Sequence, residues 1–104
     1  MVKKYNKLVR DRIPEIIEAS GKTCVFEVLT NEEYLEKLEL KLEEELAEYK
    51  EEKDLEELAD LLEVIYALAV ARGSSKEKLE EIRLKKVEER GTFENKLLLK
   101  EVKE

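Results

Sequence analysis

Two acidic residues, Glu57 and Asp60, lie three positions apart within an otherwise apolar stretch, residues 54–72 (DLEELADLLEVIYALAVAR). Residues three or four positions apart share one face of a helix, and this face continues through Val64 and Ala67. A carboxylate on an apolar face should be paired, protonated or bound to a metal, because burying it unpaired is very unfavourable. Asp is disfavoured inside helices, and the chain has only three Asp against 24 Glu. The pair therefore indicates a functional site.

A second acidic pair, Glu45 and Glu48, lies in the preceding helical pattern. Leu38 and Leu42 belong to the apolar seam of that pattern, and Glu45 takes the next inward position. The link around residues 51–54 is short, so the two helices should pack antiparallel and bring the acidic pairs together. Clustered carboxylates repel one another without a cation, and hard oxygen ligands suit Mg²⁺ or Mn²⁺. We therefore expect a metal site formed by Glu45, Glu48, Glu57 and Asp60.

The Glu45/Glu48 pair is a weak signal when it is taken alone. Glu makes up nearly a quarter of the chain, and the same spacing recurs elsewhere. A solvated helix face is therefore the simpler explanation for Glu45 and Glu48 by themselves, whereas the Glu57/Asp60 pair stands in an apolar frame and is more specific. Whether Glu44 or Glu63 also binds the metal stays open.

Composition narrows the classes of function. A chain of 104 residues fits a single domain, residues 1–104, and 42% hydrophobic residues exclude a disordered protein. The net charge of −7 argues against binding to nucleic acid or to an anionic membrane, and no run is long enough to span a bilayer. The single Cys24 excludes an internal disulfide and fits a cytoplasmic protein. Without His, neither a Ser-His-Asp triad nor a His-ligated zinc centre can form.

The elements that must position the acids are predicted to be mainly α-helical, as an antiparallel bundle. Capping residues and glycines mark four helices. These run from Arg12 or Ile13 to about Ser20 with Asp11 as N-cap, from the Thr30/Glu33 capping box to about Glu52, from about Leu55 to Arg72 before Gly73, and from Ser74 with Glu77 to about Arg90 before Gly91.

Two further segments predict a minor β element. Residues 23–29 (TCVFEVL) are β-branched and aromatic, and residues 96–102 (KLLLKEV) could form a second strand that pairs with the first. The helix over residues 55–72 is apolar on nearly all sides, with a second stripe through Leu58 and Leu62. Because so small a chain cannot cover such a helix alone, we expect dimerisation to complete the fold.

Five basic residues are candidates for binding phosphate. Lys7, Arg10 and Arg12 stand in the segment KLVRDR, and guanidinium groups match phosphate oxygens geometrically. If this segment folds over the acids, it could hold a nucleotide; the alternative is surface salt bridges in a Glu-rich protein. Lys86 and Arg90 come late in the last helix, where cations also complement the helix dipole. They are secondary candidates.

The two acidic blocks, ELAE at residues 45–48 and ELAD at residues 57–60, resemble the E-x-x-E…E-x-x-D signature of the MazG-like all-α nucleoside triphosphate pyrophosphohydrolases. The opening KLVRDRIPEII and the late RGTF resemble one subgroup, the phosphoribosyl-ATP pyrophosphohydrolase-like proteins. The resemblance covers about residues 5–99. The eight residues between the two blocks are fewer than the family pattern usually has.

The resemblance implies a helical bundle that assembles as a homodimer or higher oligomer, with Mg²⁺ bound by the four acids. It implies hydrolysis of a nucleoside triphosphate between the α and β phosphates, in some relatives as clearance of modified nucleotides. Glu48, or else Glu45, would deprotonate the attacking water, and the five basic residues would stabilise the departing pyrophosphate. Two alternatives stay open: phosphoribosyl-ATP hydrolysis in histidine biosynthesis, and a non-catalytic dimerising helical module.

Overall fold

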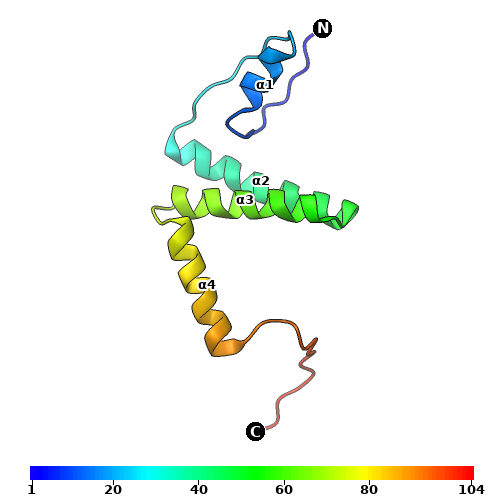
Figure 1. The fold of residues 1–104 in the computed structure, drawn as a ribbon, viewed down its shortest axis with the longest axis vertical. Helices are drawn as coiled ribbons and strands as arrows, with labels where there is room; N and C mark the ends of the chain where they lie inside the picture. Colours follow the sequence, from blue (N-terminus) through cyan, green and yellow to red (C-terminus); the bar gives the residue numbers. More distant parts are fainter.

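The computed structural model describes residues 1–104 and contains four helices and no strand. The helices are α1 (Ile13–Ala19), α2 (Asn31–Glu52), α3 (Leu55–Ala71) and α4 (Lys76–Arg90), as Figure 1 shows. The expectation of a mainly α fold is confirmed. None of the four helices combines the length and the apolar character that crossing a membrane requires.

The start of α2 follows the predicted capping box. The Thr30 hydroxyl accepts a hydrogen bond from the Glu33 N–H at 3.2 Å, and the Glu33 carboxylate accepts one from the Thr30 N–H at 3.1 Å. Two of the four orphan donors at this helix start are thereby linked into one local unit. The α2 start is therefore encoded within four residues of sequence.

Two other predicted caps are wrong by one residue. Arg12 stands at the N-cap of α1 in place of Asp11, and its side chain makes no capping bond. Ser75 caps α4 in place of Ser74, accepting a hydrogen bond from the Lys78 N–H at 3.0 Å. The N–H of Ser74 instead donates to the Ala69 carbonyl at 2.9 Å, so this residue closes the turn that follows α3.

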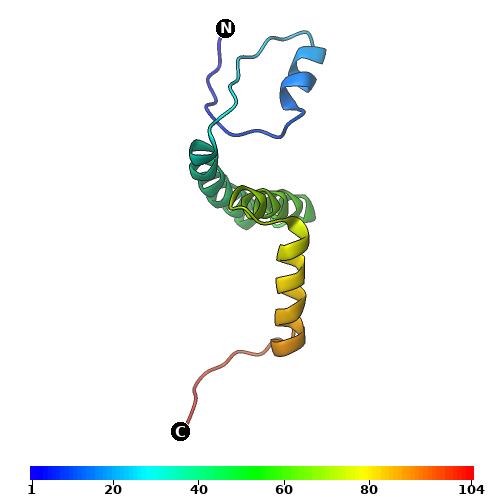
Figure 2. The ribbon, with the colours of Figure 1, turned by 90° about the vertical axis from the view of Figure 1, so that its left-hand side faces the viewer.

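The central body is an antiparallel hairpin of α2 and α3, which lie side by side in Figures 1 and 2. The link is two residues long: Lys53 adopts a left-handed conformation (φ 61°) that ends α2, and Asp54 accepts a hydrogen bond from the Glu57 N–H at 3.0 Å. Leu38 of α2 and Val64 of α3 are buried, at 2% and 8% exposure. The predicted inward faces of both helices are thus confirmed.

The chain is elongated. α4 runs away from the hairpin toward one end of the molecule, and α1 lies at the other (Figure 1). The radius of gyration is 18.4 Å, whereas a compact domain of this length would have about 13 Å. Only Leu38, Val64 and Glu45 are buried, and Leu58 and Leu62 of the second apolar stripe are 42% and 44% exposed. A single copy therefore leaves many of its large apolar side chains exposed to water.

The predicted strands over residues 23–29 and 96–102 are wrong. Both segments lack regular secondary structure, and they lie near opposite ends of the molecule (Figure 1). A strand needs a partner for its backbone N–H and C=O groups, and within one chain these two segments cannot supply it to each other. Their large apolar side chains, such as Val25 and Leu97, are exposed.

Candidate metal centre

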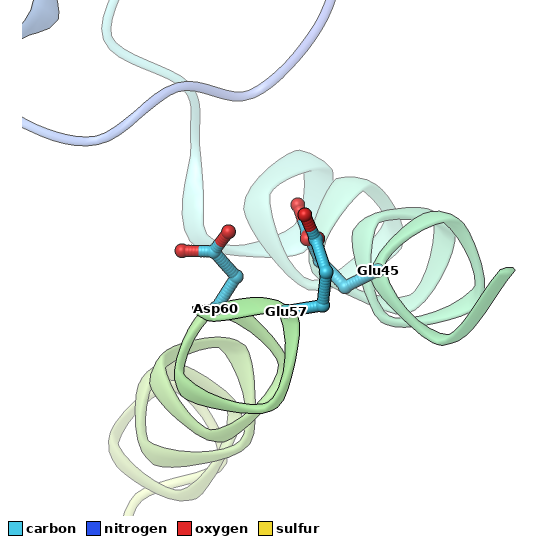
Figure 3. Close-up of side chains that lie close together, drawn as sticks. All are labelled: Glu45, Glu57 and Asp60. Carbon is cyan, nitrogen blue, oxygen red and sulfur yellow. The ribbon is translucent and has the colours of Figure 1, made fainter. Parts of the chain in front are cut away.

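Three carboxylates converge between the helices of the hairpin: Glu45 from α2, and Glu57 and Asp60 from α3 (Figure 3). One oxygen of each carboxylate lies within 4.8 Å of the other two. The spacing of three places Glu57 and Asp60 on one face of α3, and the antiparallel packing brings Glu45 opposite them. The structure thus brings together three of the four acids that the sequence singled out.

Two carboxylate oxygens in this acidic cluster lack partners. Glu45 is 7% exposed, and its Oε2 accepts no hydrogen bond; Oε2 of Glu57 is also buried without a partner. Leaving a buried polar group unsatisfied costs on the order of 1–3 kcal/mol, and more when the group is charged. Oxygen-only donors with free lone pairs are what Mg²⁺ and Mn²⁺ bind, so the residues present fit such an ion.

The electrostatics of the acidic cluster disfavour its anionic form. Burial, followed by the neighbouring charge of Glu48, raises the pKa of Glu45 above its ordinary value of 4.5, although Lys41 partly opposes the shift. Burial and Glu48 also raise the pKa of Glu57, with further contributions from Asp54 and Asp60. A bound cation would reverse both shifts, because it favours the ionised carboxylates.

Glu48 lies at the edge of the acidic cluster. It follows Glu45 by less than one turn of α2 and is exposed to solvent. Its oxygens are not among the three that converge, yet its charge acts on both Glu45 and Glu57. Water can therefore reach Glu48 while the other carboxylates are partly enclosed.

Glu44 forms ion pairs with two lysines and does not join the three converging carboxylates. Lys7 Nζ lies 3.1 Å and Lys41 Nζ 3.6 Å from Glu44 Oε1. Burial acts to raise the pKa of Glu44, but the two ammonium groups together lower it. Glu63, the other acid left open as a ligand, is exposed and does not belong to the converging group.

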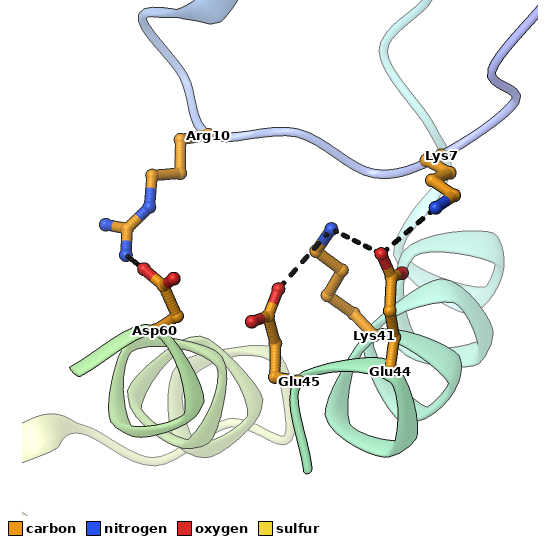
Figure 4. Close-up of polar contacts among 6 residues, drawn as sticks. All are labelled: Lys7, Arg10, Lys41, Glu44, Glu45 and Asp60. Carbon is orange, nitrogen blue, oxygen red and sulfur yellow. Dashed lines mark hydrogen bonds and ion pairs between the residues drawn. The ribbon is translucent and has the colours of Figure 1, made fainter. Parts of the chain in front are cut away.

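Two of the predicted phosphate-binding residues reach the acidic cluster from the N-terminal segment, residues 1–12 (Figure 4). Arg10 Nη2 lies 2.7 Å from Asp60 Oδ1, and Lys7 contacts Glu44 beside the cluster. Lys41 of α2 also lies 3.6 Å from Glu45 Oε1. Sequence reasoning missed Lys41, although its spacing of four from Glu45 is typical of an ion pair along a helix.

The structure does not bring the other three basic candidates to the acidic cluster. Arg12 Nε lies 3.6 Å from a carboxylate oxygen of Glu15 at the start of α1. Lys86 and Arg90 are exposed on the second half of α4, which runs away from the hairpin (Figure 1). Within one copy, Lys7, Arg10 and Lys41 are therefore the cations at the site.

Comparisons with known proteins give one partial match. The chain is 57% identical over 42 residues to an uncharacterized protein of Mycolicibacterium smegmatis (strain ATCC 700084 / mc(2)155), which is 40% of this chain and 43% of that relative. The match thus spans less than half the length of the relative. No family model and no solved structure matches the chain.

Proposed function

We propose that this chain is a Mg²⁺-dependent nucleoside triphosphate pyrophosphohydrolase, which cleaves between the α and β phosphates and yields a nucleoside monophosphate and pyrophosphate. The observation that carries the proposal is the acidic cluster of Glu45, Glu57 and Asp60, with two buried oxygens that lack partners. Cations of residues 1–12 lie next to these acids. Such a site suits a triphosphate held through a divalent ion, and the sequence resemblance supports α–β cleavage.

Glu45, Glu57 and Asp60 would hold the divalent ion, with Glu48 near enough to join them. Mg²⁺ or Mn²⁺ bound there would neutralise phosphate charge and polarise the phosphate oxygens. The protein contributes a fixed frame, because the short link and the packing of Leu38 and Val64 hold the two helices in register. The acids are therefore positioned by the hairpin before any substrate arrives.

Glu48 is the residue that we assign to water activation. It is exposed at the edge of the acidic cluster, where its carboxylate can accept a proton from water. As that proton leaves, the water oxygen bonds to phosphorus, and the bridging P–O bond breaks with its electron pair on the leaving group. Glu45 is the second candidate, but its burial and its contact with Lys41 favour a role as ligand.

Arg10 and Lys7 would stabilise charge on the departing pyrophosphate. Their side chains are 58% and 56% exposed, so both can turn from carboxylates to phosphate oxygens. Arg12 pairs with Glu15, and α4, which carries Lys86 and Arg90, runs away from the hairpin, so these three residues have no assigned step.

The functional form that we propose is a homodimer or higher homo-oligomer in the cytoplasm. The exposed stripe through Leu58 and Leu62, together with the elongated shape, supports a second copy packing on α3. Cys24 is free, which agrees with a reducing compartment.

The decisive experiment is a pyrophosphate-release assay with Mg²⁺ over standard and modified nucleoside triphosphates, with orthophosphate followed in parallel. We expect pyrophosphate and monophosphate in equal amounts. Orthophosphate as the product would contradict α–β cleavage. No product despite intact metal binding would favour phosphoribosyl-ATP as substrate, and no product without metal binding would favour a non-catalytic helical module.

A further inference from the structure

The ion pair between Arg10 and Asp60 joins residues 50 positions apart and lies on the acidic cluster itself (Figure 4). The Lys7–Glu44 contact, at 3.1 Å, is the other hydrogen-bonded link between residues 1–29 and the hairpin. α1 makes no contact of its own with α2 or α3. The polar contacts between the N-terminal part of the chain and the hairpin are thus those of Lys7 and Arg10, and both lie at the site.

We propose that residues 1–12 form a cationic strap in which Arg10 competes with the metal ion for Asp60 and moves to substrate phosphate once the metal is bound. This inference rests on the proposed function. Its basis is the 2.7 Å contact of the guanidinium with Asp60, one of the three converging carboxylates. A divalent ion held by Asp60 would lie close to this guanidinium and repel it, so the two cations compete for the carboxylate.

The ion pair between Arg10 and Asp60 is weak enough to be broken by a competing cation. The two side chains are 58% and 40% exposed, and an ion pair this accessible to water is weak. Lys41, by contrast, is 22% exposed, belongs to the same helix as Glu45 and also contacts Glu44, so it stays beside the acidic cluster even if it loses Glu45. Of the two cations that touch the metal-binding acids, Arg10 is the more exposed, and it is the one that we expect a metal ion to displace.

The Lys7–Glu44 pair keeps the strap in place after that displacement. Glu44 lies outside the three converging carboxylates, so it would not bind the metal and can keep its contact with Lys7. Lys7 is three residues from Arg10, and it therefore holds the released guanidinium within reach of the site. A freed guanidinium can bind two phosphate oxygens at once, which makes phosphate affinity dependent on prior metal binding.

The test is calorimetric titration of the full chain with Mn²⁺, without nucleotide, for wild type, Arg10→Gln and Arg72→Gln. Arg72 is the matched control, since it forms a comparably exposed pair with Glu39 at 2.9 Å and its replacement changes the net charge equally. We expect Arg10→Gln to bind Mn²⁺ about threefold or more tightly than wild type. Arg72→Gln should match wild type.

A second titration uses inorganic pyrophosphate at saturating Mn²⁺. Here Arg10→Gln should bind about tenfold more weakly, because a charge-assisted hydrogen bond is lost. Equal or weaker Mn²⁺ binding by Arg10→Gln would overturn the competition, and unchanged pyrophosphate affinity would overturn the transfer to phosphate. If none of the three proteins binds Mn²⁺, both the proposed metal site and the proposed strap are wrong. If all three bind Mn²⁺ equally, only the proposed strap is wrong.

Discussion

Glu45 on α2 and Glu57 on α3 meet across the hairpin, and each carries a buried oxygen that accepts no hydrogen bond (Figure 3). Neither helix needs an acid there for packing, because Leu38 and Val64 already supply the apolar contact. Two like charges placed in this way weaken the metal-free hairpin. Residues that lower stability in the absence of a ligand are typical of functional sites.

The variant Glu45→Gln should stabilise the metal-free protein at neutral pH, by on the order of 1 kcal/mol, because it removes the charge of a buried carboxylate whose Oε2 accepts no hydrogen bond and which Lys41 approaches only to 3.6 Å. The pKa of Glu45 is raised in the folded state, so the native protein binds this proton more tightly than the unfolded chain does. Wild-type stability from this group is therefore present at low pH and is lost as pH rises through the raised pKa. Urea unfolding with EDTA should show the advantage of Glu45→Gln at pH 7 and its disappearance in acid, and an equal advantage at all pH values would contradict the assignment.

Divalent cations should stabilise the wild-type protein. An ion that binds only the folded state adds about 2.7 kcal/mol to the free energy of unfolding when its concentration is 100 times its dissociation constant. Thermal unfolding with Mg²⁺ or Mn²⁺ measures this, and EDTA should reverse it. Glu45→Gln should respond much less than wild type. A cation effect of the same size in both proteins would place the binding elsewhere.

The variant Asp60→Asn should lose turnover by at least about 100-fold while it keeps its helix content. The side chain is 40% exposed, so its replacement disturbs little packing. Steady-state rates of pyrophosphate release, with circular dichroism as the check on folding, measure the effect. Asp54→Asn is the matched control, because Asn caps a helix as well as Asp does, and near-full activity of Asp60→Asn would rule out Asp60 as a ligand.

The variant Leu62→Glu should shift the protein from dimer to monomer. Leu62 is 44% exposed in one copy and belongs to the second apolar stripe of α3, so a charge there would be buried without a partner in the assembly. Sedimentation or light scattering should give at least twice the 12.2 kDa of one chain for wild type and 12.2 kDa for the variant. A wild-type mass of 12.2 kDa would defeat this expectation.

Local signals in the sequence predict what depends on neighbours along a helix. The Thr30/Glu33 capping box was predicted from a spacing of three, as was the shared face of Glu57 and Asp60. The inward position of Glu45 followed from the apolar seam of α2 in the same way. These features need no knowledge of distant parts of the chain.

Features that depend on distant contacts were missed or mistaken. Residues 23–29 have strand composition, but β structure requires a partner strand that this chain does not bring alongside. The contact of Arg10 with Asp60 spans 50 positions, so the sequence could offer it only as one of two explanations for the basic segment. Lys41 was overlooked because a Lys among many Glu residues looks like an ordinary surface charge.

The two-residue link at Lys53 and Asp54 also has a consequence for the order of folding. It places the acids from Glu45 to Asp60 within sixteen consecutive residues, and contacts so local close early and at small entropic cost. The long-range closure that carries Arg10 to Asp60 must come later. We therefore expect the three carboxylates to come together during folding before Arg10 reaches Asp60. A divalent ion could then bind the acids during folding, before Arg10 pairs with Asp60.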